Sequence, residues 1–419
     1  KTGSHTLLVT GHSNGMGRVW NAKNDQHIGN KIFEVDTSRV LNIGIKQSVR
    51  HISFEAENLE IAVAIDNGDV VFFKFEANQT FKNQGLCFDQ ELETKFRRFS
   101  LTDTDSILVN VRDRPPPHLK YGFMPHFAIH SRHGSVTALH LSCTGVLVVA
   151  YHDGFMLVVG LSNEAIIFNK SVKDIFLSKS NYVTSIDISV MRYGGDDYSS
   201  IIMTCGTDLG QILSFRLIPD GIGSLRVEFL KTTGLLLKGK ILKIQTFNEE
   251  TFGLCKDKDS LGLSKKCVRG KLVLIGSKEV CIFYPGKEKN ELFRKTFDNT
   301  LIAGSICLNI QHSLREQVAI FISITSNREI IIFRLRDFAK LSSFFLPSSV
   351  SHVLTSAIAN NGNLVIKDNE YHSILISLLK DETSFTENGD VVLFKSNQES
   401  LSRPQVNSLQ WMRGTSYVT

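Results

Sequence analysis

The stretch Leu147-Val148-Val149-Ala150-Tyr151-His152-Asp153-Gly154-Phe155-Met156-Leu157-Val158-Val159 carries the pattern that decides the fold. Two short runs rich in β-branched residues flank a polar turn containing Asp-Gly, and this order predicts a β-hairpin. The pattern occurs six more times along the chain. We predict hairpins within residues 7–21, 61–73, 147–159, 201–215, 272–283, 320–333 and 374–394.

The spacing of these hairpins indicates a repeat architecture. Their turns lie on average about 62 residues apart, whereas a four-stranded propeller blade of WD type needs about 40–45 residues. Each repeat therefore fits one blade with loop insertions. We interpret the hairpins as the outer strand pairs, and alternating segments such as 136–141 and 183–188 as inner strands. The predicted fold is all-β, a seven-bladed WD-type β-propeller.

The two ends of the chain fit a closed ring. The first hairpin has no inner strands before it, and residues 405–411 and 415–418 resemble an inner pair without an outer hairpin. If the N-terminal and C-terminal strands pair with each other, the ring closes and no strand edge stays exposed. We therefore divide the chain into a propeller at 1–403 and closing strands, or the start of a C-terminal tail, at 404–419.

Composition is that of a globular protein. Of 419 residues, 42% are hydrophobic and 21% are charged, which excludes a wholly disordered, collagenous or coiled-coil chain. Seven cysteines without close pairing predict reduced thiols in a cytoplasmic protein. The chain begins at Lys1, and we expect it to be a piece of a longer protein.

Two sequence motifs suggest catalysis or nucleotide binding, but neither fits its chemistry. Gly11-His12-Ser13-Asn14-Gly15 matches a nucleophile elbow, which requires a helix after the serine, whereas a strand is predicted here. Residues 234–241 match a phosphate-binding loop, but Ile241 stands where Ser or Thr must bind magnesium.

Histidines gather loosely at positions 126, 130, 133 and 140, with Asp153 downstream. No cysteine pair accompanies them, and zinc requires three or four ligands in a fixed local geometry. We expect surface or turn histidines, no metal, no cofactor and no catalytic residues, so the chain is predicted not to be an enzyme.

Charge is concentrated in one segment. The chain has a net charge of +5, but residues 256–295 alone carry +6 and the remainder −1. A solvated loop and a docking surface for an acidic protein or anionic lipid both explain the segment, whereas nucleic acid is not expected. A second basic feature lies beside Pro115-Pro116-Pro117, in a stretch predicted to be extended and exposed. The candidate partner-binding residues are Lys256, Lys258, Lys265, Lys266, Arg269, Lys271, Arg97, Arg98, Arg112 and Arg114.

Several longer stretches resemble a known family. They are Phe96–Leu101, Val111–Arg114, Gly122–Pro125, Tyr198–Asp208 and, most specifically, Arg403–Thr415. Together they are similar to the lethal giant larvae/tomosyn family, in particular to its yeast members that regulate exocytosis. Members of the family have two seven-bladed propellers and a C-terminal tail, and the chain resembles the second propeller.

The resemblance implies a non-enzymatic scaffold that promotes vesicle docking and fusion at the plasma membrane. Its implied partners are a t-SNARE of the Qbc class, an exocytic Rab GTPase, the exocyst and an N-terminal propeller in cis. The implied location is the cytoplasm, with peripheral association at sites of secretion. The alternatives are a propeller that docks on an anionic membrane or an acidic protein through its basic loop, and an enzyme hosted by a propeller.

Overall fold

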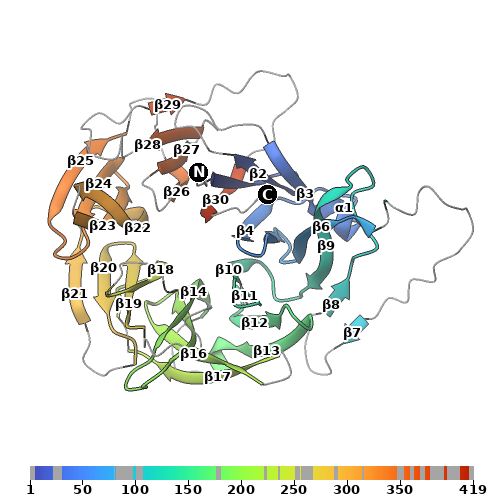
Figure 1. Cartoon of the computed structure of the whole chain (residues 1–419), viewed down its shortest axis with the longest axis horizontal. Helices are drawn as coiled ribbons and strands as arrows, with labels where there is room; N and C mark the ends of the chain where they lie inside the picture. The colour runs from blue at the N-terminus through green and yellow to red at the C-terminus, as the bar shows by residue number, and fades with distance from the viewer. Residues whose placement is uncertain are drawn as a thin grey trace, which may run out of the picture. The chain divides into compact units, whose positions relative to one another are not determined.

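The computed structural model describes residues 5–21, 31–79, 81, 98–100, 107–175, 181–220, 224–234, 236–250, 255, 268–286, 291–313, 316–346, 353–358, 363–368, 373–377, 391–393 and 406–414. Within these residues the chain is almost entirely β-strand (Figure 1), and its two helices are the single turns α1 (Thr37–Leu41) and α2 (Val172–Ile175). The chain forms two compact units, Lys1–Asn169 with Glu399–Thr419, and Lys170–Gln398.

The first unit contains three antiparallel sheets. One has the order β3-β2-β1-β30, the second β4-β5-β6-β9-β8-β7 and the third β10-β11-β12-β13. The strands are β1 (His5–His12), β2 (Met16–Asn21), β3 (Lys31–Asp36), β4 (Val49–Glu55), β5 (Glu60–Ile65), β6 (Val70–Ala77), β7 (Arg98–Ser100), β8 (Ile107–Asn110), β9 (Tyr121–His130), β10 (Val136–Ser142), β11 (Val146–Tyr151), β12 (Phe155–Gly160), β13 (Ala165–Ser171) and β30 (Val406–Gly414).

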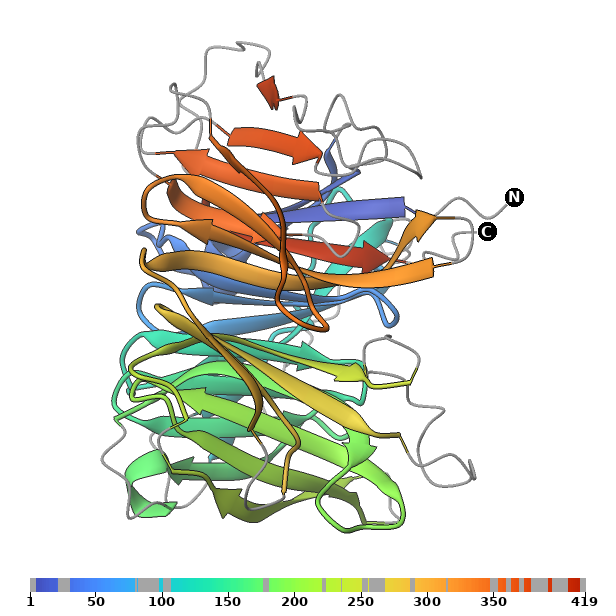
Figure 2. The same cartoon turned by 90° about the vertical axis from the view of Figure 1, so that its left-hand side faces the viewer.

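The second unit contains four sheets, each with four strands in sequence order, and Figure 2 shows the orange strands of one of them running side by side. The strands are β14 (Val183–Arg192), β15 (Ser199–Thr207), β16 (Ile212–Pro219), β17 (Leu225–Thr232), β18 (Ile241–Asn248), β19 (Gly270–Gly276), β20 (Glu279–Phe283), β21 (Glu291–Thr296), β22 (Leu301–Ser313), β23 (Glu316–Thr325), β24 (Glu329–Arg334), β25 (Lys340–Phe345), β26 (Val353–Ile358), β27 (Asn363–Asp368), β28 (Ser373–Ser377) and β29 (Val391–Leu393).

The first six predicted hairpins are present, but their place in the sheet differs from the prediction. In the third repeat the hairpin is β11–β12, and it occupies the two middle positions between β10 and β13. The interpretation as an outer pair was therefore wrong. The physical reason is burial: a middle strand packs on both faces, so it consists of a continuous apolar run, and all six residues of β11 are buried.

The seventh hairpin was assigned to the wrong pair of strands. The middle pair of the last sheet is β27–β28, in which Leu364 faces Ile376, and the predicted second strand is the edge strand β29. The run Leu364-Val365-Ile366 lies in the middle strand β27, whereas the prediction took the equally apolar run at 391–394 as the second strand of this hairpin.

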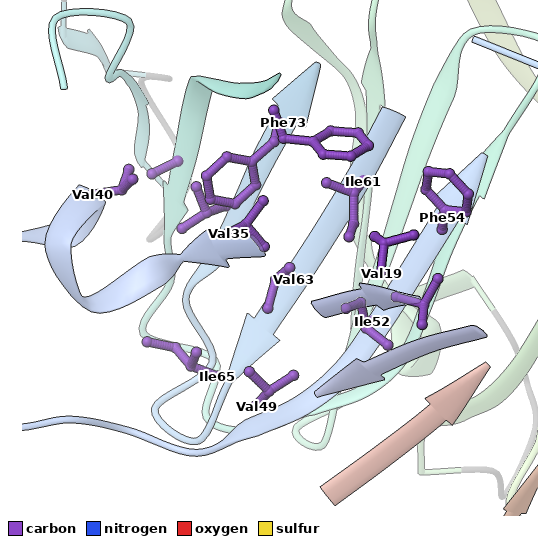
Figure 3. Packing of buried hydrophobic residues seen from close by; sticks show 14 of the residues in the cluster. Val19, Val35, Val40, Val49, Ile52, Phe54, Ile61, Val63, Ile65 and Phe73 are labelled. Atoms are coloured by element: carbon purple, nitrogen blue, oxygen red, sulfur yellow. The ribbon is translucent and has the colours of Figure 1, made fainter. Parts of the chain in front are cut away.

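Apolar side chains of neighbouring sheets interlock to form the cores. In the first unit, Ile61, Val63 and Phe73 pack against Val19 and Val35, as Figure 3 shows. Val40 of α1 joins this cluster, and Asp36 caps the helix by accepting a hydrogen bond from the Arg39 amide at 3.1 Å.

The N-terminal strand pairs with the C-terminal one. β1 and β30 are antiparallel from His5 opposite Gly414 to His12 opposite Val406. The C-terminal segment thus contributes one strand to the described structure rather than the expected pair. This strand completes a four-stranded sheet that the first hairpin could not complete alone.

The insertion between β6 and β10 adds strands to its sheet. After β6 the chain returns as β7, β8 and β9, which makes a six-stranded sheet in which β9 pairs directly with β6. The residues predicted as an extended loop at 112–117 follow β8 and are held closely by their surroundings, as described below.

Candidate interaction surfaces

The segment Arg112–Pro117 is anchored to the first unit rather than freely exposed. Arg39 donates to the Pro115 carbonyl at 2.6 Å, and Arg114 donates to the Val40 carbonyl at 2.6 Å. The side-chain amide of the buried Asn78 donates to the carbonyls of Pro116 and Leu119. These bonds fix the insertion against α1 and the end of β6. Arg112 and Pro117 are exposed, as predicted, whereas Arg114, Pro115 and Pro116 are half-buried.

Arg112 belongs to a cluster of charged side chains around His126 on β9. Arg112 forms an ion pair with Glu164, and the His126 ring nitrogens lie 3.0 Å from Glu164 and 3.2 Å from Glu76. Glu164 has φ = +50°, a left-handed backbone conformation that residues other than glycine rarely adopt. The turn between β12 and β13 is thus held in a strained shape that presents this carboxylate to the neighbouring sheet.

The pKa of Glu164 reflects this cluster. Burial raises it, but the hydrogen bond with His126 and the positive charge of Arg112 outweigh burial, and the net pKa lies below the usual 4.5. The carboxylate therefore stays ionised, and Arg112 is engaged within the chain.

The basic segment begins with residues 256–267, which lie outside the described residues, but the residues on either side of this stretch are attached at a defined place. The Val190 amide of β14 donates to the Cys255 carbonyl at 2.7 Å, and the Arg192 amide donates to the Val268 carbonyl at 2.8 Å. Cys255 and Val268, which flank positions 256–267, are thus bonded to two residues of β14 that lie two positions apart. The predicted residues Lys256, Lys258, Lys265 and Lys266 lie between these anchors.

The two basic residues after the second anchor differ in environment. The Arg269 side chain is exposed, and its carbonyl accepts a hydrogen bond from the Glu249 amide at 3.0 Å. Lys271 forms an ion pair of 2.7 Å with Glu249 and lies over the ring of Tyr284. Burial and the hydrogen bond to Glu249 raise the pKa of Tyr284 to about 12. The Lys271 side chain is therefore engaged in contacts within the chain, whereas the exposed Arg269 side chain can contact a partner.

In the other basic feature, Arg97 lies outside the described residues and Arg98 belongs to the short edge strand β7. Arg114 and Arg112 are both engaged as described above. Arg112 and Arg114 are the two candidate arginines of this insertion whose side chains the structure describes, and both have partners within the chain.

Long-range ion pairs such as Arg112–Glu164 and Lys271–Glu249 could not be predicted from the sequence, because the residues involved are 52 and 22 positions apart and no motif marks them.

The role of aspartates in the hairpin turns was also missed, although an aspartate recurs in several of these turns in the sequence. Asp66 accepts hydrogen bonds from Ser48, Asp208 accepts them from Asn181, and Asp153 lies 2.6 Å from His133. Each aspartate ties the turn of a middle hairpin to the segment that enters its own sheet.

The two motifs that match a nucleophile elbow and a phosphate-binding loop have structural roles. Gly11 and His12 end β1, Ser13–Gly15 form the turn to β2, and the Gly15 carbonyl accepts a hydrogen bond from the Thr37 hydroxyl at 2.7 Å. In the loop that resembles a phosphate-binding loop, the Leu236 and Leu237 amides both donate to the Gly210 carbonyl, and the Lys238 amide donates to Glu279. These amides cannot also cradle a phosphate.

The first strands of the second unit carry the titratable groups that an enzyme would need, but the groups are engaged in hydrogen bonds. Asp187 accepts a hydrogen bond from Thr246, and Lys243 donates to Ser305 at 2.8 Å. Burial, together with the charge of Asp187, raises the pKa of the Cys255 thiol to about 12, so it is not a nucleophile at neutral pH. Among the described residues, no group of three or more His, Cys, Asp or Glu could hold a metal ion.

Sheets of four antiparallel strands, linked in sequence and tied by aspartates at the hairpin turns, define a WD-type β-propeller protein. The C-terminal WD40 domain of Sif2 superposes with a TM-score of 0.50 at 9% identity, over 89% of this chain and 78% of that one. Saccharomyces cerevisiae Sqt1 superposes with a TM-score of 0.50 at 11% identity, over 90% and 96%. These similarities confirm the predicted all-β propeller of WD type, and the number of seven blades stays a prediction.

Sequence comparison places the chain within one group of such proteins. The family model described as "Lethal giant larvae (Lgl) like, C-terminal" matches residues 46–419. The chain is 34% identical to the Saccharomyces cerevisiae protein "Lethal(2) giant larvae protein homolog SRO77", over 99% of its own length and 42% of that protein's length. The chain therefore belongs to the lethal giant larvae family, and it spans less than half of this relative.

No helix among the described residues is both long and apolar enough to cross a membrane.

Proposed function

We propose that this chain is the C-terminal propeller of a non-enzymatic scaffold that acts in polarised exocytosis. The observation that carries the proposal is the 34% identity to a yeast lethal giant larvae homologue, which extends over 99% of the chain. The scaffold promotes vesicle docking and fusion at the plasma membrane, with which it associates peripherally from the cytoplasm.

The partners in this proposal are a t-SNARE of the Qbc class, an exocytic Rab GTPase and the exocyst. Propellers bind partners through loops on a rigid frame of sheets. Two sequence insertions suit this role. One is anchored beside α1, and the other lies between β18 and β19 and is bonded to β14 through Cys255 and Val268. We also propose that residues 1–403 form one ring of seven blades, closed by the strand at its C-terminus and joined in cis to an N-terminal propeller.

The experiment is a pull-down of the purified chain against the t-SNARE and against the Rab loaded with GTP or GDP, beside the full-length protein. We expect the chain to retain at least one of the two partners. If the full-length protein retains both partners and the chain retains neither, the partner assignment to this propeller is wrong.

A second function is favoured by the fixed attachment of the basic segment. Two backbone hydrogen bonds to β14 fix Cys255 and Val268 on either side of residues 256–267, and residues 256–271 carry a net charge of +4. This charge next to two fixed ends supports docking on an anionic membrane or an acidic protein. The discriminating variant reverses Lys265, Lys266 and Arg269 but keeps Lys271, because Lys271 is paired with Glu249.

For this variant we expect weaker flotation with anionic vesicles or weaker capture of the acidic partner, with the larger loss at low salt. The control is Lys231→Glu on the outer strand β17, which also reverses an exposed charge. Unchanged binding in the triple variant, or an equal loss of binding in Lys231→Glu, would contradict this proposed function.

A further inference from the structure

The ring of His126 on β9 contacts charged groups from three other segments of the first unit. Glu76 belongs to β6, Glu164 to the turn between β12 and β13, and Arg112 follows the end of β8. His126 is only 8% exposed, so these three side chains, rather than water, determine the hydrogen bonds of its ring.

Two partners compete for the Nδ1 atom of His126. Nδ1 lies 2.9 Å from Nη2 of Arg112 and 3.0 Å from Oε1 of Glu164. The same Nη2 atom of Arg112 also donates to the same Oε1 atom of Glu164. A guanidinium only donates and an ionised carboxylate only accepts. Nδ1 must therefore lack a proton to bond with Arg112, and must carry one to bond with Glu164.

The other ring nitrogen decides which neutral form of His126 fits. Nε2 lies 3.2 Å from Oε1 of Glu76, and a carboxylate requires a donor at this position. Nε2 therefore carries a proton in both states of the ring. The neutral ring leaves Nδ1 unprotonated and accepts a hydrogen bond from Arg112, whereas the imidazolium donates to both glutamates.

The surrounding charges accommodate the additional proton. With a neutral ring, the carboxylates of Glu76 and Glu164 face the single positive charge of Arg112. Lys74, two residues before Glu76 on β6, is paired with Glu60 at 3.2 Å. A buried charge requires partners of opposite sign, and the imidazolium has one carboxylate at each of its nitrogens.

We propose that His126 is a proton-controlled switch that determines whether Glu164 is bonded mainly to Arg112 or to the imidazole ring. When the ring is neutral, Arg112 bonds to both Nδ1 and Glu164. When the ring gains a proton, Nδ1 donates to Glu164 and repels Arg112. The Arg112 side chain, already 44% exposed, then turns to solvent and is free to bind an acidic group.

This exchange takes place near neutral pH, where an imidazole gains and loses its proton. It is a property of the chain alone and does not depend on the proposed function. Its consequence for binding is that acidification makes Arg112 available to a partner.

The first test observes the ring nitrogens of isotope-labelled histidine by NMR, and the variant His126→Gln identifies the signal. At about pH 8 we expect the neutral ring with its proton on Nε2, and at about pH 5 the imidazolium. A neutral ring with its proton on Nδ1 would overturn the proposal, because that form cannot accept a hydrogen bond from Arg112.

The second test measures how fast the guanidinium protons of Arg112 exchange with water, relative to those of the exposed Arg132. Loss of the bond to Nδ1 predicts about fivefold weaker protection of these protons at about pH 5 than at about pH 8. In His126→Gln the protection should be equal at both pH values. His130→Gln is the matched control, because His130 is paired with Asp69 instead, and it should keep the full change.

Equal thermal melting of the variants verifies that each folds, and the measurements on the unsubstituted chain need no variant to be decisive. Protection of Arg112 that does not change with pH in the unsubstituted chain would refute the switch. The same change in His126→Gln would show that another group controls Arg112.

Discussion

At the scale of single residues, the tightest constraint lies where a turn glycine meets the loop that enters the next sheet. Gly210 has φ = +83°, and a Cβ atom added to it would lie 2.0 Å from the Leu237 carbonyl oxygen. Gly239 has a similar φ of +93° but open space around it. The pair separates the cost of backbone strain from the cost of steric overlap.

We predict that Gly210→Ala lowers the free energy of unfolding by about 2 kcal/mol more than Gly239→Ala does. In both variants an alanine must adopt a left-handed backbone conformation, but only Gly210→Ala also displaces the backbone around Leu237. Urea denaturation of the two variants, followed by fluorescence, measures the difference. Equal losses would show that the turn and the loop are not in contact.

The Glu164 carboxylate makes stability depend on pH. Its pKa is below 4.5 in the folded chain, so it stabilises the fold above the pKa of the unfolded chain, and this contribution disappears as pH falls through the folded value. We predict that Glu164→Gln lowers stability at pH 7 by about 1 kcal/mol and that the loss is smaller at about pH 3, where protonation of the carboxylate has begun to remove this contribution.

Denaturant titrations at both pH values measure this difference. The control is Glu228→Gln on β17, which removes an exposed carboxylate. A loss for Glu164→Gln that does not depend on pH would contradict the role of the ionised carboxylate.

At the scale of elements, the pairing of β30 with β1 links the two ends of the chain. We predict that deletion of residues 404–419 lowers the melting temperature by about 5 °C or more, because it removes β30 and exposes the edge of β1. Deletion of 415–419 alone keeps β30 and should leave the melting temperature within about 1 °C. Differential scanning calorimetry compares the two, and equal melting of the longer truncation and the intact chain would refute closure by β30.

The elements that the sequence predicted are those with two buried faces. Runs such as Leu147–Ala150 are continuous and apolar because they pack on both sides, and six of the seven hairpins were found from such runs. The order of strands within a sheet was mispredicted, since the edge strands have mixed polarity and do not reveal which neighbour they join. The helix α1 is too short to show a 3.6-residue period, and its local signals are the two caps, Asp36 at its start and the left-handed Asn42 at its end.

The candidate site was less predictable than the fold. Clusters of basic residues are visible in a sequence, but their availability depends on partners far away in the chain. Lys271 and Arg112 were chosen for their charge, and both form ion pairs with glutamates that only the folded chain brings close. Arg269, chosen for the same reason, has an exposed side chain.

At the scale of the whole molecule, the chain belongs to the lethal giant larvae family and spans 42% of the yeast relative. The proposed scaffold works by arranging partners, so its activity is binding, and binding to the Rab should depend on the bound nucleotide.

The most direct test of the proposed function is an equilibrium titration of fluorescently labelled exocytic Rab with the purified chain. We predict saturable binding of the GTP-loaded Rab, with an affinity at least about tenfold higher than for the GDP-loaded form, a difference of about 1.4 kcal/mol. Equal affinity for both forms, or absence of binding by this chain when the full-length protein binds, would contradict the assignment of Rab recognition to this propeller.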